Sequence, residues 1–511
     1  MAAIQSGRGL PVARRGTAAP SVPRRYAWKR NRSCQRGAIA IMFALLTIVL
    51  IGFFGLALDL GQVYNRRIEL RNIAAGAALA AAKELNGTAA GVTKALTKAA
   101  SITSKLSYQY NQQSLSWNDA AIAFSSTADG PWLDAGAAQG APDGLLFAKV
   151  DTSGFDVSVG TVNLLFMKVL SSAFASTTTV NQTIAGRSSI LITPLAICAL
   201  STTPAASRSN PGPPANTELV EFGFRRGVSY DLMNLNPNGT TAENFVIDPL
   251  DPPGVLGAAS NTWPATVGPF VCTGALAIPR VMGGTITVGR PFPLASLVNQ
   301  LNARFDQYVG NQCSPNGAPP DSNVKSYPYT AIPWMTTIPG QQGALSTTSG
   351  SKLWTIADPA PAPGTNIAPN YGPLWAYARA VPYSSYTTQG SPEPASGYTP
   401  FSTSAWAVLY KPGQPTANGN YPGGVTTPYK TSSSANFLAP STQNGPGVAN
   451  RRVLNVALLS CPVGGGATTT ANVIGIGKFF MLVPATATSI NAEFAGAVPE
   501  QYLGGQVELV P

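Results

Sequence analysis

The sequence contains no histidine, and this absence removes most of the common catalytic and metal-binding arrangements. Without imidazole there is no Ser-His-Asp or Cys-His nucleophilic site and no His-ligated zinc site. The Gly-x-Ser-x-Gly nucleophile elbow and the Gly-x4-Gly-Lys-Ser/Thr phosphate-binding loop are also absent. We therefore predict that the chain is not an enzyme, that it has no catalytic residue, and that it binds no cofactor, metal or small-molecule substrate.

Charge is scarce as well, because only 11% of the 511 residues are charged, against about 25% in ordinary soluble domains. The formal net charge of +11 is unevenly distributed. Residues 1–36 contain nine basic and no acidic side chains, which leaves 24 basic against 22 acidic residues in the rest of the chain. We therefore predict no nucleic-acid partner, and we interpret residues 1–36 as a disordered basic tail.

Long apolar runs are absent too, with one exception at residues 37–58, which contain no charged side chain. At 1.5 Å per residue, roughly 20 helical residues cross the ~30 Å hydrocarbon core of a bilayer. The basic residues that precede the run, Arg30, Arg32 and Arg36 among them, favour a cytoplasmic N-terminus. A cleaved signal peptide is the alternative, but its apolar core is usually 7–15 residues long. We predict an uncleaved single-pass anchor with its N-terminus in the cytoplasm and the rest of the chain delivered across the membrane.

Only five cysteines are present, and Cys34 alone precedes the apolar run. The other four fall beyond the run, in a compartment that favours two disulfides with three possible connectivities. Cys198 and Cys461 each follow an apolar, strand-like run, so neighbouring core strands would place them side by side. Cys272 and Cys313 lie in one segment. We predict the pairs Cys198–Cys461 and Cys272–Cys313.

After the apolar run, residues 59–85 keep an apolar periodicity close to that of a helix. Asn86 and Gly87 favour the left-handed conformation that ends a helix, and a second helix is predicted over 88–106. We expect Asp59, where the anchor ends, to be a solvated carboxylate at the membrane surface rather than a functional carboxylate inside the membrane. Residues 59–110 are therefore predicted to form a helical stem.

The same segment resembles the N-terminal domain of the TadE/TadG-like family of the Tad (Flp-type) pilus assembly system. The resemblance covers about residues 35–85 and is carried by the apolar run, an Ala-rich tract, and Arg36, Gly37, Asp59, Gly61, Tyr64, Leu70 and Asn72. Family members typically have an acid within the Ala-rich tract, where this chain has Gly76.

The resemblance implies a structural component anchored in a bacterial inner membrane, with its C-terminal region in the periplasm, that acts through periplasmic contacts with other pilus-assembly proteins or pilins. Pilin-like relatives have a Glu five residues after the Gly at their cleavage point. The corresponding residue after Gly37 is Met42, so we predict no cleavage by a prepilin peptidase.

Beyond the stem the sequence predicts an α+β chain that is mainly β outside the membrane. We expect a small α+β domain over 111–200, a Pro-rich linker over 201–217 and a larger β-rich domain over 218–511. A hairpin is expected to turn near Arg226 and Gly227. Strands are predicted at 120–124, 145–150, 155–159, 178–184, 189–200, 284–288, 353–356, 375–381, 406–410, 453–460, 473–483 and 507–510, and helices at 163–170 and 293–308.

Aromatic residues support one alternative function. Trp354, Trp375, Tyr377, Trp406 and Tyr410 lie on predicted strands, and we expect most of them to pack in a core. If they were exposed instead, the chain would be an anchored adhesive module that binds glycan or another envelope polymer. A Ser-x-x-Lys pair, Ser349 and Lys352, raises a Ser–Lys hydrolase as a third possibility, but the pair is predicted in a loop rather than at a helix start.

Overall fold

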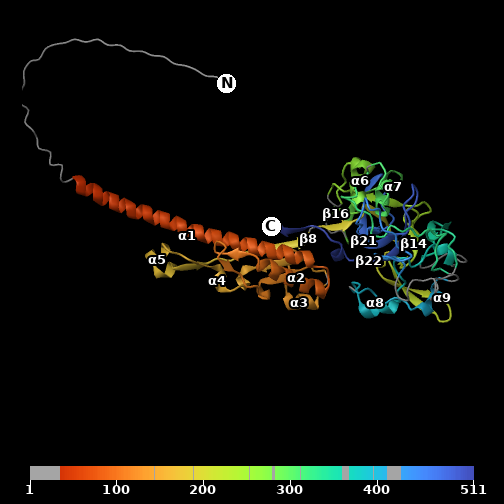
Figure 1. The fold of residues 1–511 in the computed structure, drawn as a ribbon, viewed down its shortest axis with the longest axis horizontal. Coiled ribbons are helices and arrows are strands. Elements are labelled where there is room, and N and C mark those ends of the chain that lie inside the picture. The colour runs from red at the N-terminus through yellow and green to blue at the C-terminus, as the bar shows by residue number, and fades with distance from the viewer. Residues whose placement is uncertain are drawn as a thin grey trace, which may run out of the picture. The chain divides into compact units, whose positions relative to one another are not determined.

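The computed structural model describes residues 35–142, 144–187, 189–251, 254–278, 282–310, 312–335, 337–358, 368–394, 396–410 and 427–510 (Figure 1). Nearly all of the predicted basic tail, including Arg30, Arg32 and Cys34, lies outside these residues. Contacts divide the chain into two units. The first contains the chain up to Val63 together with Asn163–Thr177, and the second contains Tyr64–Val162 with Thr178–Pro511.

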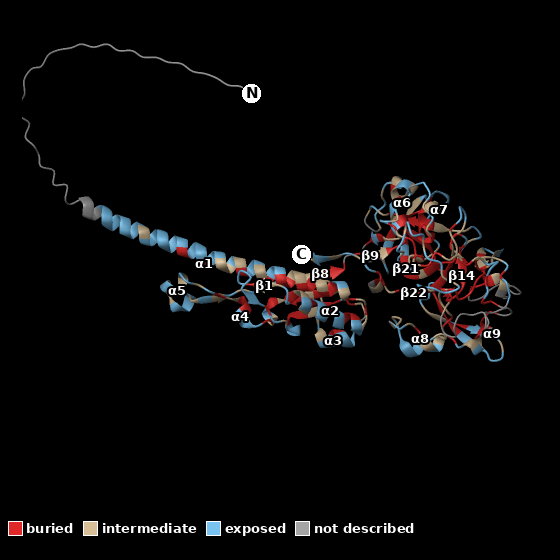
Figure 2. Cartoon of the chain, in the orientation of Figure 1, coloured by how far each residue is buried: buried red, intermediate tan, exposed pale blue. Residues whose placement is uncertain are grey.

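A single 50-residue helix, α1 (Gln35–Glu84), runs through the predicted anchor and stem. It contains no proline, and its N-terminal half is almost wholly aliphatic or aromatic. Among the residues that the structure describes, it is the one helix long and apolar enough to cross a membrane. Figure 2 shows that this half of α1 is almost entirely exposed; Ile48, Phe53 and Phe54, for example, are each more than 60% exposed.

The second half of α1 buries one stripe of side chains at helical spacing: Leu70, Ile73, Ala74, Ala77, Ala78, Ala81 and Ala82. Leu85, directly after the helix, is buried in the same core. Helix α2 (Ala89–Thr103) contributes Val92, Ala95 and Ala99 to the same core. Its predicted start is confirmed, because Thr88 Oγ1 accepts a hydrogen bond from the Gly91 N–H at 3.0 Å.

A five-stranded antiparallel sheet, in the order β23-β8-β5-β3-β4, completes this core. Its strands are β3 (Ile122–Ser125), β4 (Leu133–Asp134), β5 (Phe147–Asp151), β8 (Gln182–Arg187) and β23 (Val507–Val510). Strand β23 comes from the end of the chain and pairs with β8 from Val507–Arg187 to Val510–Ile184. The C-terminal strand therefore belongs to the small α+β region rather than to the β-rich region.

Short elements connect these strands. They are β1 (Ser107–Tyr108), β2 (Gln113–Ser114), η1 (Asp119–Ala121), α3 (Ala135–Gly140), η2 (Thr152–Gly154), α4 (Val157–Gly160), β6 (Thr161–Asn163), α5 (Met167–Leu170), η3 (Ser172–Phe174) and β7 (Ser176–Thr178). The predicted strand at 155–159 is wrong. Asp156 accepts a hydrogen bond from the Ser158 N–H at 2.9 Å and caps the short helix α4 instead.

The β-rich region is built on a seven-stranded sheet, β14-β22-β21-β17-β15-β10-β20, in which β20 also pairs with β21. This extra pairing closes five of the strands into a ring. The strands are β10 (Leu195–Cys198), β14 (Ser229–Asp231), β15 (Asn244–Ile247), β17 (Thr285–Gly289), β20 (Val453–Leu459), β21 (Thr468–Met481) and β22 (Asn491–Ala497). Leu195 and Ile197 face one buried cluster, whereas Ala196 and Cys198 face another, so both faces of the sheet are covered.

Smaller elements surround the ring. They are β9 (Ile190–Ile192), β11 (Ala206–Asn210), β12 (Asn216–Glu221), β13 (Phe224–Arg225), η4 (Ala259–Thr262), α6 (Pro264–Thr273), β16 (Leu276–Ile278), α7 (Leu294–Asn302), η5 (Ala303–Phe305), β18 (Ser346–Ser349), β19 (Lys352–Thr355), η6 (Ala368–Tyr371), α8 (Tyr383–Gln389), η7 (Thr403–Ala405), α9 (Trp406–Leu409) and η8 (Glu500–Tyr502). Strand β9 pairs with β16, and β18 pairs with β19.

Three sequence predictions for this region need correction. The predicted linker 201–217 contains β11 and the start of β12, because three of its four prolines lie in the connection between these strands and Pro204 precedes β11. The predicted hairpin turns at Phe222 and Gly223, which both have positive φ. The predicted strand 406–410 is the short helix α9, and 375–381 contains no strand because its backbone bends at Trp375, where φ is 59°.

A buried carboxylate on β22 makes the stability of this region pH-dependent. Glu493 is fully buried and accepts N–H hydrogen bonds from Ala376, Tyr377 and Ala378 at 2.6–3.0 Å. Burial raises its pKa from 4.5 to about 7, although the three N–H donors act in the opposite direction. The folded state therefore binds this proton more tightly than the unfolded state does. The resulting stabilisation is complete below pH 4.5 and is lost as the pH rises through 7.

We expect the free energy of unfolding to fall by up to about 3 kcal/mol between pH 4.5 and 7.5 through Glu493 alone, since each pKa unit corresponds to about 1.4 kcal/mol. Urea unfolding at a series of pH values measures this slope. Glu493→Gln removes this titrating group and should reduce the slope over this range, although Asp231, whose pKa burial raises to about 6, still titrates there. The same slope in wild type and E493Q would contradict the assignment.

Candidate functional site

The apolar half of α1 ends at a buried carboxylate. Asp59 is 1% exposed, and its two oxygens accept hydrogen bonds from the backbone N–H groups of Leu165, Phe166 and Met167 at 3.0, 2.9 and 2.7 Å. These donors open helix α5, so the carboxylate satisfies three N–H groups that would otherwise lack partners. The expectation that Asp59 would be solvated is wrong, because the segment 163–177 covers it.

One turn before Asp59, the same segment lies directly on the backbone of α1. A Cβ atom added to Gly55 would lie 2.5 Å from the ring of Phe166, a distance at which the two groups would overlap. Gly55 therefore allows the close approach of Phe166, and any larger residue would push the segment off the helix. Gly55, Asp59 and residues 165–167 together form a contact that we call the Asp59 clamp.

A second polar contact forms two turns further along α1. Arg66 is buried and donates hydrogen bonds to the carbonyl oxygens of Val159 at 2.7 Å and Thr161 at 3.3 Å. Its Nε lies 3.3 Å from the carboxylate of Glu69. Glu69 in turn accepts the backbone N–H groups of Gln109 and Tyr110, each at 2.9 Å. Arg66 and Glu69 thus tie two distant loops to α1, although neither was singled out from the sequence.

The residues that carry the family resemblance all lie on α1, in different environments. Leu70 is fully buried in the core against α2, whereas Tyr64 is 67% exposed and Asn72 is also exposed. Gly61 faces open space, since an added Cβ would contact nothing within 4 Å. Arg36 and Gly37 lie in the first turn of the helix, where only the backbone is described. Among those of the seven residues whose side chains are described, Asp59 is the one with a polar contact to a distant part of the chain.

The exposed side of the stem borders a cavity of about 760 Å³. Tyr64, Arg67, Ile68 and Arg71 line it from α1, and residues 181–184 with Leu509 and Val510 line it from β8 and β23. Arg67 and Arg71 are exposed, one helical turn apart, and the ion pairs of the described residues do not include them. The cavity therefore presents, beside the edge of a sheet, two cations that no ion pair between described residues neutralises.

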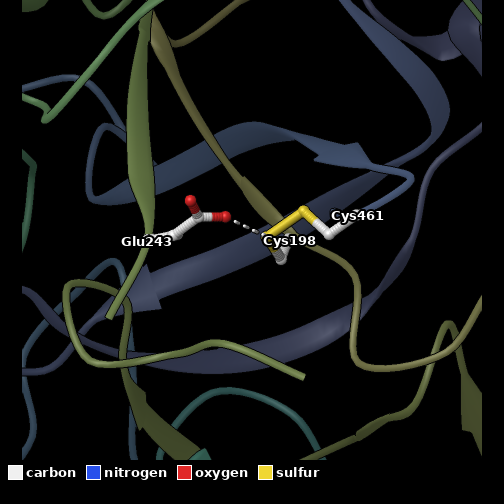
Figure 3. A group of neighbouring side chains, drawn as sticks. All are labelled: Cys198, Glu243 and Cys461. Carbon is white, nitrogen blue, oxygen red and sulfur yellow. Dashed lines mark hydrogen bonds between the residues drawn. A yellow bond between two sulfur atoms is a disulfide. The ribbon is translucent and has the colours of Figure 1, made fainter. Parts of the chain in front are cut away.

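Both predicted disulfides are present, with Cα–Cα distances of 5.6 Å in Cys198–Cys461 and in Cys272–Cys313. A carboxylate oxygen of Glu243 lies 3.9 Å from Cys198 Sγ (Figure 3). The three side chains have the composition of a metal site. However, both sulfurs are bonded to each other and offer no thiolate, so this group does not fit a metal ion.

The aromatic residues do not form an exposed platform. Trp375, Trp406 and Tyr410 are at most 1% exposed and pack against one another, with ring centroids 4.6 and 5.5 Å apart. Ser349 and Lys352 are cross-strand partners in the β18–β19 hairpin rather than neighbours on a helix. Lys352 is 3.3 Å from Asp358 and is thus held in an ion pair.

The helix that bears the Asp59 clamp matches a known family. Residues 37–84 match the family model described as putative Flp pilus-assembly TadE/G-like, as the sequence resemblance predicted. No curated protein and no solved structure matches the chain. The family match supports a role in Flp pilus assembly.

Proposed function

We propose that this chain is a single-pass inner-membrane component of a Tad/Flp-type pilus assembly or secretion system. Its N-terminus lies in the cytoplasm and its β-rich region in the periplasm, where it acts through protein–protein contacts and not through catalysis. The observation that carries the proposal is that the segment matching the family is also the exposed, apolar helix α1. In water such a helix would leave a large apolar surface uncovered, whereas a bilayer covers it.

The orientation is supported by features on both sides of the apolar run. Nine basic residues precede residue 37, and cytoplasmic flanks of spanning helices are rich in Lys and Arg. Both disulfides lie beyond residue 58, in the part of the chain that the proposal assigns to the oxidising periplasm.

The cavity beside the stem suggests the chemistry of the partner. Arg67 and Arg71 are exposed, form no ion pair with another described residue, and line the cavity together with Tyr64, an aromatic residue of a type enriched in interfaces. The partner that we propose is an acidic segment of another pilus-assembly protein or of a pilin, which pairs with these two arginines.

Piliation of the source bacterium tests this function. We expect deletion of the gene to abolish or strongly reduce Flp-type pili in electron micrographs, and the full chain to restore them. A double variant, R67E/R71E, should fail to restore pili because it repels an acidic partner. The matched control K94E/K98E makes the same charge change on exposed positions of α2 and should restore them. Normal pili in the deletion strain would overturn the proposal.

A further inference from the structure

The segment 163–177, which the Asp59 clamp holds, exposes an unusual amount of apolar surface. Leu165 is 65% exposed, Val169 85% and Phe174 51%, all within ten residues. The segment contains no acidic residue and one basic residue, Lys168. A surface loop of this length in a soluble protein is ordinarily polar. We call the exposed side chains of Leu165, Val169 and Phe174 the apolar tip, and we expect another apolar surface to cover them.

Eight backbone N–H groups of the same segment have acceptors on Asp59 or within the segment. Asp59 accepts three of these N–H groups, and the Leu164 N–H donates to the Ala175 carbonyl at 2.9 Å. The N–H groups of Val169, Ser171, Phe174 and Ala175 all donate to carbonyl oxygens within the segment. These N–H groups therefore need no water as a hydrogen-bond partner. A backbone N–H group can enter the apolar part of a bilayer only when it is hydrogen-bonded within the protein in this way.

The position of the segment along α1 matches the end of the apolar run. Phe166 lies on Gly55, about 4.5 Å of helix rise before Leu58, and residues 165–167 surround Asp59, the first charged residue after the run. The exposed apolar tip is thus at the level where a bilayer around α1 passes from hydrocarbon to headgroups. Lys168 is exposed and has a long side chain that reaches the headgroup layer from such a position.

From these observations we propose that the segment 163–177 is a second membrane contact, which inserts its apolar tip into the outer boundary of the same bilayer that α1 crosses. This inference rests on the proposed membrane anchoring. The occupant of the apolar surface is lipid, not protein. The segment 163–177 and α1 would then attach the chain to the membrane at two points, which the Asp59 clamp joins. This double attachment would hold the membrane-proximal part of the chain at a fixed depth.

Fluorescence quenching in liposomes tests the depth of the segment. In the full chain with Cys34→Ser, Val169→Cys is labelled with an environment-sensitive dye. We expect blue-shifted emission that is quenched by lipids with a nitroxide near the headgroup and less by lipids with a nitroxide deep in the acyl chain. The matched control Val255→Cys, an exposed valine of the β-rich region, should be quenched only from the aqueous phase.

A third label, at Leu50→Cys in the middle of the apolar run, separates the two proposals. If the label at residue 50 is protected by lipid but that at residue 169 is open to aqueous quenchers, the second contact is wrong and the anchor stands. If neither is protected by lipid, the anchoring itself is wrong. If residue 169 is shielded from water yet insensitive to lipid nitroxides, protein covers the tip and the lipid proposal is overturned.

Discussion

Replacing Cys198 and Cys461 with alanine is expected to lower the free energy of unfolding of the β-rich region by about 5 kcal/mol. The bridge spans 263 residues, and in the chain-entropy model a loop of this length restricts the unfolded chain more than a short one does. It also joins the ends of two parallel neighbours in the closed ring, since β10 pairs with β20 from Ala196–Ala457 to Cys198–Leu459. Because a loss of this size approaches the whole stability of a typical domain, we expect the variant to be largely unfolded at 37 °C.

The control is the pair Cys272→Ala and Cys313→Ala, whose bridge spans 41 residues and should contribute about 4 kcal/mol in the same model. Urea unfolding of the full chain in detergent, followed by tryptophan fluorescence, measures both. Trp375 and Trp406 are buried in the β-rich core and report on this region. A loss below about 1 kcal/mol for the long bridge would contradict its assigned role, because even strained native disulfides usually contribute more.

Replacing Asp59 with alanine is expected to release the segment 163–177 from α1. The change removes the acceptor of three backbone N–H groups, and each buried donor left without a partner costs about 1–3 kcal/mol. The attachment should therefore weaken by at least about 3 kcal/mol, more than a hundredfold in its equilibrium. The rest of α1 should remain helical, because the buried core that this helix shares with α2 begins only at Leu70, eleven residues beyond Asp59.

Hydrogen exchange of the amides at 165–167 measures this effect directly, since Asp59 is their hydrogen-bond acceptor. We expect protection to be lost in D59A. In the matched control Asp134→Ala, which removes one N–H acceptor at the start of α3, these three amides should keep their protection. Unchanged protection in D59A would show that the clamp does not hold the segment.

Features that depend on local pattern could be predicted from the sequence. The long helix α1 follows from one apolar run and one helical periodicity, and the start of α2 follows from Asn86, Gly87 and Thr88. The Cys198–Cys461 pair was predictable because each cysteine ends an apolar strand, and two such strands pair in the core.

Features that join distant parts of the chain could not be predicted. Asp59 and its three donors are 106–108 residues apart, and no local pattern connects an acid at the end of an anchor to the start of α5. The sequence predicted a strand at β23. It did not predict that this strand pairs with β8, some 320 residues earlier, because strand pairing over such a distance depends on the overall topology. The alternating pattern of aromatic residues at 375–381 and 406–410 wrongly predicted strands. In the structure these aromatic residues fill the core from a loop and from a helical turn.

The central claim, that α1 crosses the membrane and delivers the rest of the chain to the periplasm, is tested most directly by a reporter enzyme that is active only outside the cytoplasm and is fused after Pro511. The full chain should give high reporter activity in the membrane fraction. Leu50→Arg should reduce it, because an arginine at the centre of a spanning helix costs about 2.5–3.5 kcal/mol on insertion, whereas Leu50→Ala should retain it. A silent fusion in well-expressed, full-length protein would contradict the account, as would equal activity in L50R and L50A.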